Sequence, residues 1–266
     1  KKVWESIKKA EEKCEGMCSL IGAFHTTKAF HIVQQGLEIM KERGRDGAGY
    51  YDGAVHYAPS PSTIPVSAEK HIIGHTLHAV VNTVPQPIQH QNGVLVFNGE
   101  IYNWKTLAER HSIHAKNDAD LFCQLLAALG MEKTIADVRG VYAFAYWEGD
   151  RVFIARDILG IKPLWYGYDG KTLVFASEKK AIGSCSFPVS ELNPRTMLAY
   201  TVSTGDLEMI ERPFFPFGDD VADERQAIGS RRPAERRHIA LRGCVSAIVE
   251  EAPGSARDQP SRCLND

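Results

Sequence analysis

Several features that mark common protein classes are missing from this chain. No apolar run approaches the roughly eighteen residues of a membrane span, and residues 1–16 are too charged for the apolar core of a secretory signal. The formal net charge of −2 at pH 7 gives no broad attraction to nucleic acid or to a membrane surface. There is no G-x-G-x-x-G and no phosphate-binding loop. We therefore expect no nucleic-acid partner, no membrane association and a cytoplasmic location.

Cysteine is sparse as well, and its six residues lack the paired spacing of a metal site. Cys14 and Cys18 form one C-x3-C pair, but no second pair with suitable spacing follows. Scattered single cysteines are typical of a reducing compartment, and we expect no bound metal.

The end of the chain lacks two residue types altogether. No lysine and no aromatic residue follows Phe217, although arginine is frequent there. A segment without aromatic anchors is poorly equipped to form a core. We therefore divide the chain into a leader or mis-assigned start (1–16), a folded body (17–217) and an arginine-rich tail (218–266). Three interpretations of the tail stay open: a flexible or grafted end, a polar linker, and sequence that has left its reading frame.

The body alternates strand and helix patterns in a way that is typical of an α+β fold. Apolar runs at 18–24 and 93–103 and a hairpin pattern at 141–157 predict strands. Apolar residues at helical spacing over 28–44, and an acidic start with a glycine stop over 118–130, predict two helices. Because hairpin patterns dominate, the sheets are expected to be largely antiparallel.

The dipeptide Met17-Cys18 suggests a chain that begins at the cysteine once the methionine is removed. A thiol with an ordinary pKa of about 8.5 needs a base, and a free α-amine, with a pKa near 8, suits that task. If Cys18 were the first residue, its own amine could take the thiol proton. A small buried cysteine on a strand is the plainer interpretation, and both stay open.

Two further segments carry polar groups suited to acyl chemistry. Asn98 and Gly99 lie at a strand end, where a side-chain amide and a backbone N–H can converge on an oxyanion, although Asn-Gly is also a common turn. Asp118 and Asp120 open a helix. They act there either as helix caps or as a carboxylate for the ammonium group of an amino-acid substrate.

Eight motifs in a fixed order point to one family: Met17-Cys18, RGRDGAG (43–49), GHTLH (74–78), QPI (86–88), NGEIYN (98–103), NDAD (117–120), ARDILGIKPLWY (155–166) and FASEKKAI (175–182). Over about residues 17–217 they resemble a class II glutamine amidotransferase domain. More narrowly, they resemble the glutaminase domain of glutamine-hydrolysing asparagine synthetases. The resemblance implies an Ntn-hydrolase (N-terminal nucleophile) fold, a four-layer αββα sandwich of two largely antiparallel sheets between helices.

The resemblance also implies roles for individual residues. Cys18 would attack the side-chain amide of the substrate glutamine and form a thioester, with Asn98 and Gly99 as oxyanion donors. Asp118 would hold the substrate ammonium group, and Glu100 would lie in the same pocket.

Other positions depart from the family pattern or are expected to be structural. Where the family has an arginine for the substrate carboxylate, this chain has Leu77, followed by His78 as a candidate donor. Arg156, Asp157 and Lys162 are expected to hold the sheet and its loops together.

A full asparagine synthetase also carries a pyrophosphatase-type ATP loop, and no SGGxDS stretch occurs in this chain. We therefore expect no cofactor here, ATP and Mg²⁺ only in a missing synthetase domain, and a synthetase domain or subunit as the acceptor of ammonia. Residues 218–266 would then be a truncated or out-of-frame synthetase remnant. Two alternatives stay open: a non-catalytic Ntn-fold domain with a regulatory or binding role, and a non-functional fragment.

Overall fold

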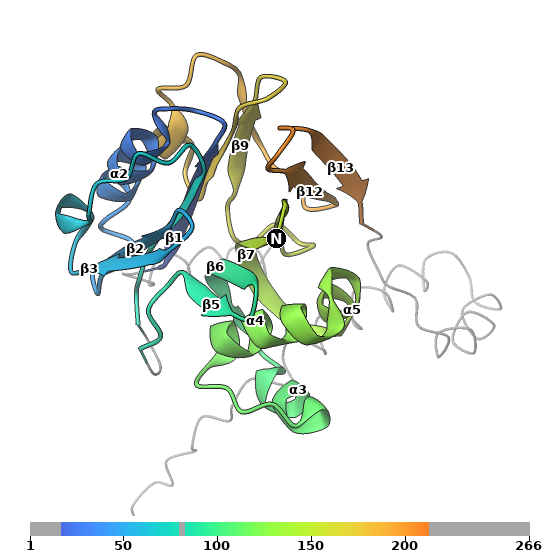
Figure 1. Cartoon of the computed structure of the whole chain (residues 1–266). Coiled ribbons are helices and arrows are strands. Elements are labelled where there is room, and N and C mark those ends of the chain that lie inside the picture. Colours follow the sequence, from blue (N-terminus) through green and yellow to red (C-terminus); the bar gives the residue numbers. More distant parts are fainter. Residues whose placement is uncertain (1–16, 80–82, 213–266) are drawn as a thin grey trace, which may run out of the picture. The chain divides into compact units, whose positions relative to one another are not determined.

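The structure is a computed structural model, and it describes residues 17–79 and 83–212. Within these residues the strands form two antiparallel sheets (Figure 1). The seven-stranded sheet has the order β11-β9-β10-β1-β4-β2-β3, and the six-stranded sheet has the order β13-β12-β8-β7-β6-β5. The predicted leader (1–16) and tail (218–266) lie outside the described residues, so these boundaries stay predictions.

The seven-stranded sheet contains β1 (Ser19–Phe24), β2 (Ala48–Tyr51), β3 (Val55–Ala58), β4 (Ile72–Thr76), β9 (Trp165–Tyr168), β10 (Leu173–Ala176) and β11 (Val189–Glu191). The six-stranded sheet contains β5 (Ile88–His90), β6 (Gly93–Ile101), β7 (Gly140–Glu148), β8 (Arg151–Arg156), β12 (Thr196–Thr201) and β13 (Leu207–Glu211). The helices are α2 (Ala29–Ile39), α3 (Trp104–His111), α4 (Asp118–Leu129) and α5 (Met131–Asp137), with the 3-10 turns η1 (Pro61–Thr63) and η2 (Lys179–Ile182).

Alternating side chains divide the core into three layers. Leu20 of β1 and Val96 of β6 belong to the core between the two sheets. Ile21, the next residue on β1, packs against α2 on the outer face of the first sheet. Phe97 packs against Phe122 of α4 on the outer face of the second sheet. Successive strand residues point to opposite faces, and the result is the four-layer αββα sandwich that the resemblance predicted (Figure 1).

The predicted elements are present, with shifts at their ends. The predicted hairpin is formed by β7 and β8, and α4 ends at Leu129 with the predicted stop, Gly130, as its C-cap. Its first turn is capped by Asn117, whose side chain accepts a hydrogen bond from the Asp120 N–H at 2.9 Å. Helix α2 ends at Ile39, before the predicted stop at Gly44. Gly44 instead lies against β4, where an added Cβ would come within 2.6 Å of the Thr76 carbonyl carbon.

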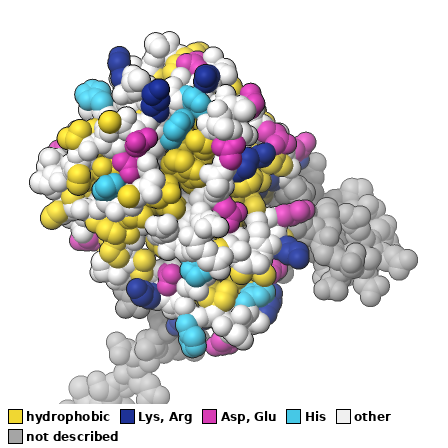
Figure 2. All heavy atoms as spheres, in the orientation of Figure 1, with side chains coloured by type: hydrophobic (Ala, Val, Ile, Leu, Met, Phe, Trp, Pro, Cys, Tyr) yellow, Lys and Arg dark blue, Asp and Glu magenta, His cyan; other side chains and the backbone are white. Residues whose placement is uncertain are grey.

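The surface shows mixed charge. Figure 2 shows acidic and basic side chains interspersed over the face in view, which agrees with the formal net charge of −2. Within the described ranges, every helix is too short or too polar to cross a bilayer.

Candidate active site

The site begins where β1 begins. Cys18 immediately precedes β1 and is half-buried. Its Sγ accepts from the His78 N–H at 3.3 Å and lies 3.6 Å from the His78 carbonyl oxygen. Next along the chain, the hydroxyl oxygens of Ser19 and Thr76 are 2.6 Å apart and join β1 to β4. The sulfur therefore has a fixed place at one end of the first sheet.

Asn98 of β6 faces this place from the second sheet. Even-numbered residues of β6 belong to the core between the sheets, so Asn98 points into the same space. His75 of β4 links the first sheet to β6. It lies opposite Leu20 of β1, and its Nε2 donates to the Phe97 carbonyl at 2.9 Å. Cys18 precedes Leu20 by two residues, and Asn98 directly follows Phe97. The predicted nucleophile and the predicted oxyanion donor are thus brought to one region.

The amide group of Asn98 is an unused donor. The residue is 2 % exposed, and its Nδ2 has no hydrogen-bond partner among the described residues. A buried donor left unpaired costs about 1–3 kcal/mol, so its presence points to a partner that arrives with a ligand. An oxyanion formed during acyl transfer is a partner of that kind.

The free edge of β6 supplies backbone donors. Strand β5 pairs with only the first part of β6. Beyond it, the Gln86 side chain replaces a strand, because its Oε1 accepts from the Phe97 N–H at 2.7 Å and its Nε2 donates to the Phe97 carbonyl at 3.0 Å. Further along, the Asp118 carboxylate accepts from the Ile101 N–H at 2.9 Å. Alternate residues present their backbone groups to the same edge, so the Gly99 N–H lies here, between two positions that side chains satisfy.

Gly99 is required by close packing and not by a turn. An added Cβ would lie 2.4 Å from the Val141 carbonyl oxygen and 2.6 Å from the Tyr142 Cα. The Asn98-Gly99 pair lies within β6, so the turn interpretation of this dipeptide is wrong. Any side chain at this position would push β7 away from β6 and displace the predicted donors.

Charges around Cys18 act in both directions. Burial raises the pKa of its thiol above the ordinary value. The His78 N–H and the cations of Lys162 and Arg43 oppose this rise in the thiol pKa, whereas the Asp118 carboxylate adds to it. The thiol therefore depends on nearby cations and on a base for its reactivity.

Asp118, the predicted ligand of the substrate ammonium group, lies near Glu100, which was predicted to share its pocket. Burial raises the pKa of the Asp118 carboxyl against the effect of backbone hydrogen bonds, and the nearby Glu100 adds to that rise. Glu100 itself is exposed, at the rim of the site. Within the described residues no group of three or more His, Cys, Asp or Glu side chains could hold a metal ion.

His78, the predicted carboxylate donor, is placed differently. Its backbone contacts the Cys18 sulfur, whereas its ring Nδ1 lies 3.6 Å from the Asp46 carboxylate. The Asp46 carboxylate also accepts a hydrogen bond from the Ala79 N–H at 2.7 Å. Leu77, the residue before His78, is buried. Because the Asp46 charge would repel a second carboxylate, the role of His78 in substrate binding stays a prediction.

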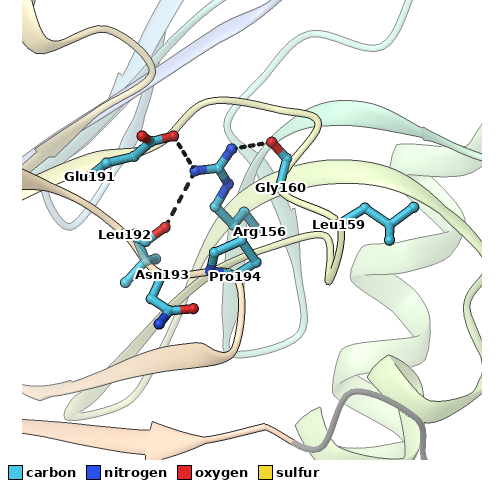
Figure 3. Close-up of a pocket in the computed structure, with 7 residues that line it drawn as sticks. All are labelled: Arg156, Leu159, Gly160, Glu191, Leu192, Asn193 and Pro194. Carbon is cyan, nitrogen blue, oxygen red and sulfur yellow. Dashed lines mark hydrogen bonds and ion pairs between the residues drawn. The ribbon is translucent and has the colours of Figure 1, made fainter. Parts of the chain in front are cut away.

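The loop that follows β8 is fastened by Arg156. Its Nη1 pairs with Glu191 at 2.7 Å and donates to the Leu192 carbonyl at 3.3 Å, and its Nη2 donates to the Gly160 carbonyl (Figure 3). These groups line a pocket together with Leu159, Asn193 and Pro194 (Figure 3). The Nη1 and Nη2 groups of Arg156 thus hold the loop, as expected from the sequence, whereas its buried Nε has no partner among the described residues.

Asp157, the next residue, fastens the same loop further along the chain. Its carboxylate accepts from the N–H groups of Ile161 and Lys162, each at 3.0 Å. The side chain of Lys162 then reaches the start of β1, where its Nζ lies 3.7 Å from the Met17 Sδ. Lys162 therefore lies at the site itself, which the structural role expected for it did not include.

Four residues lie near Cys18 or β6 although the sequence did not place them at the site. They are Arg43, His75, Gln86 and Lys162. Each lies in a motif that carried the family resemblance. Periodicity assigns residues to faces, but it does not say which side chain reaches Cys18 or the backbone of Phe97. The one available signal was the clustering of polar residues in these motifs.

The sandwich, the cysteine that precedes its first strand and the open edge of β6 together define a glutamine amidotransferase domain of the Ntn type. A family model described as "Glutamine amidotransferase domain" matches residues 17–213, and the chain belongs to this family.

Within the family, the chain is similar to asparagine synthetases. "Asparagine synthetase B [glutamine-hydrolyzing]" of Escherichia coli (strain K12) is 33% identical over 180 residues, which cover 62% of this chain and 30% of the relative. "Putative asparagine synthetase [glutamine-hydrolyzing] 1" of Methanocaldococcus jannaschii is 32% identical over 226 residues, which cover 73% of this chain and 41% of the relative. The chain thus spans less than half the length of these relatives.

A solved structure shares the fold. Glutamine phosphoribosylpyrophosphate amidotransferase of B. subtilis superposes with a TM-score of 0.62 at 23% identity, and the match covers 75% of this chain and 50% of that chain. A second solved structure, described as the allosteric regulatory enzyme of purine biosynthesis, superposes with a TM-score of 0.61 at 21% identity, and the match covers 75% of this chain and 50% of that chain. Both matches support the Ntn-hydrolase sandwich.

Proposed function

We propose that this domain hydrolyses the side-chain amide of glutamine to glutamate and ammonia, once Cys18 is the first residue of the chain. In the 266-residue sequence the Cys18 nitrogen is part of the peptide bond to Met17, and an amide nitrogen is no base. Removal of the residues up to Met17 converts it to an α-amine with a pKa near working pH.

The proposed reaction follows acyl-transfer chemistry. The Cys18 sulfur adds to the amide carbon of glutamine while its proton passes to the free α-amine. The carbonyl oxygen becomes an oxyanion that accepts hydrogen bonds from the Asn98 amide and the Gly99 N–H. Collapse breaks the C–N bond, the amine returns the proton to the departing ammonia, and a thioester remains. Water then hydrolyses the thioester, which releases glutamate and restores the thiol.

One observation carries the proposal above the others. The buried Asn98 Nδ2 is without a partner among the described residues, on the strand that faces Cys18. A purely structural asparagine at a buried position would be expected to use that donor. The partner that we propose for it exists only during the reaction.

The proposed destination of the ammonia is a synthetase that makes asparagine. The relatives named above support this, since their printed names describe glutamine-hydrolysing asparagine synthetases. ATP and Mg²⁺ would belong to that synthetase part. We propose that it lies in another domain or subunit, because the sequence contains no SGGxDS stretch.

The test compares two forms of the protein, one that begins at Lys1 and one that begins at Cys18, with the first residue of each established by intact mass. Glutamate and ammonia are measured after incubation with glutamine. We expect activity only in the form that begins at Cys18. Full activity of the form that begins at Lys1 would contradict the role of the α-amine.

The matched control is Cys18→Ala in the form that begins at residue 18. It should fold as the parent does, by circular dichroism and melting temperature, and release no ammonia. Ammonia release at the parent rate would exclude Cys18 as the nucleophile. With aspartate and ATP added, the parent should still make glutamate and ammonia but no asparagine.

A further inference from the structure

Lys162 carries a half-buried positive charge without a matching negative one. No ion pair among the described residues includes it, and the one acceptor found for its Nζ is the Met17 Sδ at 3.7 Å. A thioether sulfur is a weak acceptor. A cation in this state is expected to gain a better partner when the site is in use.

The backbone around Lys162 is held firmly in place. Asp157 is 2% exposed, its carboxylate accepts from two successive N–H groups, and its own N–H donates to the Tyr142 carbonyl at 2.6 Å. Arg156 holds Gly160 in the same loop (Figure 3). The loop thus delivers the Lys162 ammonium to Met17, from which it is separated by 145 residues in sequence.

The other charges around Cys18 are accounted for. Arg43 faces it from beyond α2 but forms an ion pair with Glu178, with 3.1 Å between Nη1 and Oε1. Asp118 faces it from the start of α4 and is engaged by the Ile101 N–H.

Two further titratable side chains lie near the site, and neither supplies an unpaired cation. Glu100 acts on Asp118, and the His78 ring lies against the Asp46 carboxylate. Lys162 is therefore the cation near the sulfur that lacks a carboxylate partner among the described residues.

We propose that Lys162 is a positioning residue for glutamine hydrolysis, whose charge beside Cys18 favours the thiolate and the neutral α-amine. A positive charge stabilises a neighbouring anion and destabilises a neighbouring ammonium group. Both effects move the reactive state of Cys18 to lower pH. Loss of Met17 leaves the new terminus and the thiol as the groups beside the lysine. The effect on catalysis rests on the proposed function, whereas the effect on the thiol does not.

The first experiment measures the thiol directly in the full chain. Iodoacetamide labelling of the peptide that contains Cys18 is followed by mass spectrometry across a pH series. The substitution Lys162→Met keeps an unbranched side chain, one atom shorter, and removes its charge. It should raise the midpoint of labelling by about 0.5–1 pH unit, as expected for one partly screened charge within several ångströms. The shift should shrink at 1 M salt, where the Debye length is about 3 Å.

Two control variants separate charge from structure. Lys162→Arg keeps the charge and should label as the parent does. Lys171→Met removes a lysine near His25, beyond the opposite end of β1 from Cys18, and should leave the midpoint unchanged. Melting temperatures of all variants are compared with the parent. An equal midpoint in the parent and in Lys162→Met, with both folded, overturns the proposal.

The second experiment follows kcat/KM for glutamine against pH in the form that begins at Cys18. Lys162→Met should move the acid limb to higher pH by about the same amount as the labelling midpoint, and Lys162→Arg should restore it. An unmoved acid limb overturns the catalytic effect. If no form hydrolyses glutamine but the labelling midpoint still shifts, the proposed function fails and the charge effect of Lys162 on the thiol stands.

Discussion

His75 should make the stability of this domain depend on pH below neutrality. The side chain is fully buried, its Nε2–H donates to the Phe97 carbonyl at 2.9 Å, and its Nδ1 has no partner among the described residues. Burial lowers the pKa of His75 from 6.5 to about 3, against the opposing effect of that hydrogen bond. The imidazole is therefore neutral in the folded protein, with its hydrogen on Nε2.

The direction of the effect follows from proton binding. As the pH falls, the unfolded chain binds a proton at this histidine near pH 6.5, whereas the folded chain does not. The contribution of the neutral His75 to the free energy of unfolding is fully present above about pH 6.5 and is lost progressively toward about pH 3. A difference of one bound proton between the unfolded and folded states changes the free energy of unfolding by about 1.4 kcal/mol per pH unit, or by about 3 kcal/mol between pH 6 and pH 4. That loss is large beside a typical stability of about 5–15 kcal/mol.

The assay is urea unfolding at a series of pH values, followed by tryptophan fluorescence, for the parent and for His75→Gln. Glutamine can donate to the Phe97 carbonyl but does not titrate. The variant should be less stable at pH 7 and should lose stability more slowly on acidification, by about 1.4 kcal/mol per pH unit. Groups far from His75 cancel in this comparison. Equal pH slopes would show that the buried imidazole does not titrate as we infer.

Three substitutions test the site itself. Asn98→Ala should lower kcat for glutamine about a hundredfold or more without lowering the melting temperature, because the lost Nδ2 donor has no partner among the described residues; an unchanged kcat would remove Asn98 from the mechanism. Gly99→Ala should lower both turnover and stability, because its Cβ would meet the Val141 carbonyl oxygen at 2.4 Å. The loss of stability in urea unfolding should be roughly 1–3 kcal/mol. A urea midpoint equal to that of the parent would count against the close packing. Asp118→Asn keeps an acceptor for the Ile101 N–H and removes the negative charge. The KM for glutamine should therefore rise more than kcat falls. An unaltered KM would speak against the binding of the substrate ammonium group by Asp118.

Local sequence patterns predicted the elements of this fold because each pattern follows from contacts along one strand or helix. The apolar spacing before Gly44 predicted α2, and the acidic start before Gly130 predicted α4. The end of α2 was placed too late, because Gly44 serves the close approach to β4 and not the end of the helix. The largely antiparallel sheets followed from the hairpin patterns and the four-layer sandwich from the family resemblance, and the fold confirms both.

The details of the site depend on contacts between distant parts of the chain, which periodicity does not contain. His75 reaches Phe97 across the two sheets, and Lys162 reaches Met17 from a loop far along the chain. The expectation for His78 shows the same gap, because its place in a motif did not reveal that its ring faces Asp46.

The way in which Gln86 completes β6 also bears on self-association. An uncovered strand edge is a template onto which another chain can add a strand. Continuing the pairing of Ile88 with Leu95 places Gln86 opposite Phe97, and there the glutamine side chain occupies both the N–H and the carbonyl of Phe97. A foreign strand would have to displace that amide before it could pair. The domain can therefore keep the edge of β6 near Gly99 open to a small molecule while remaining protected against edge-to-edge aggregation.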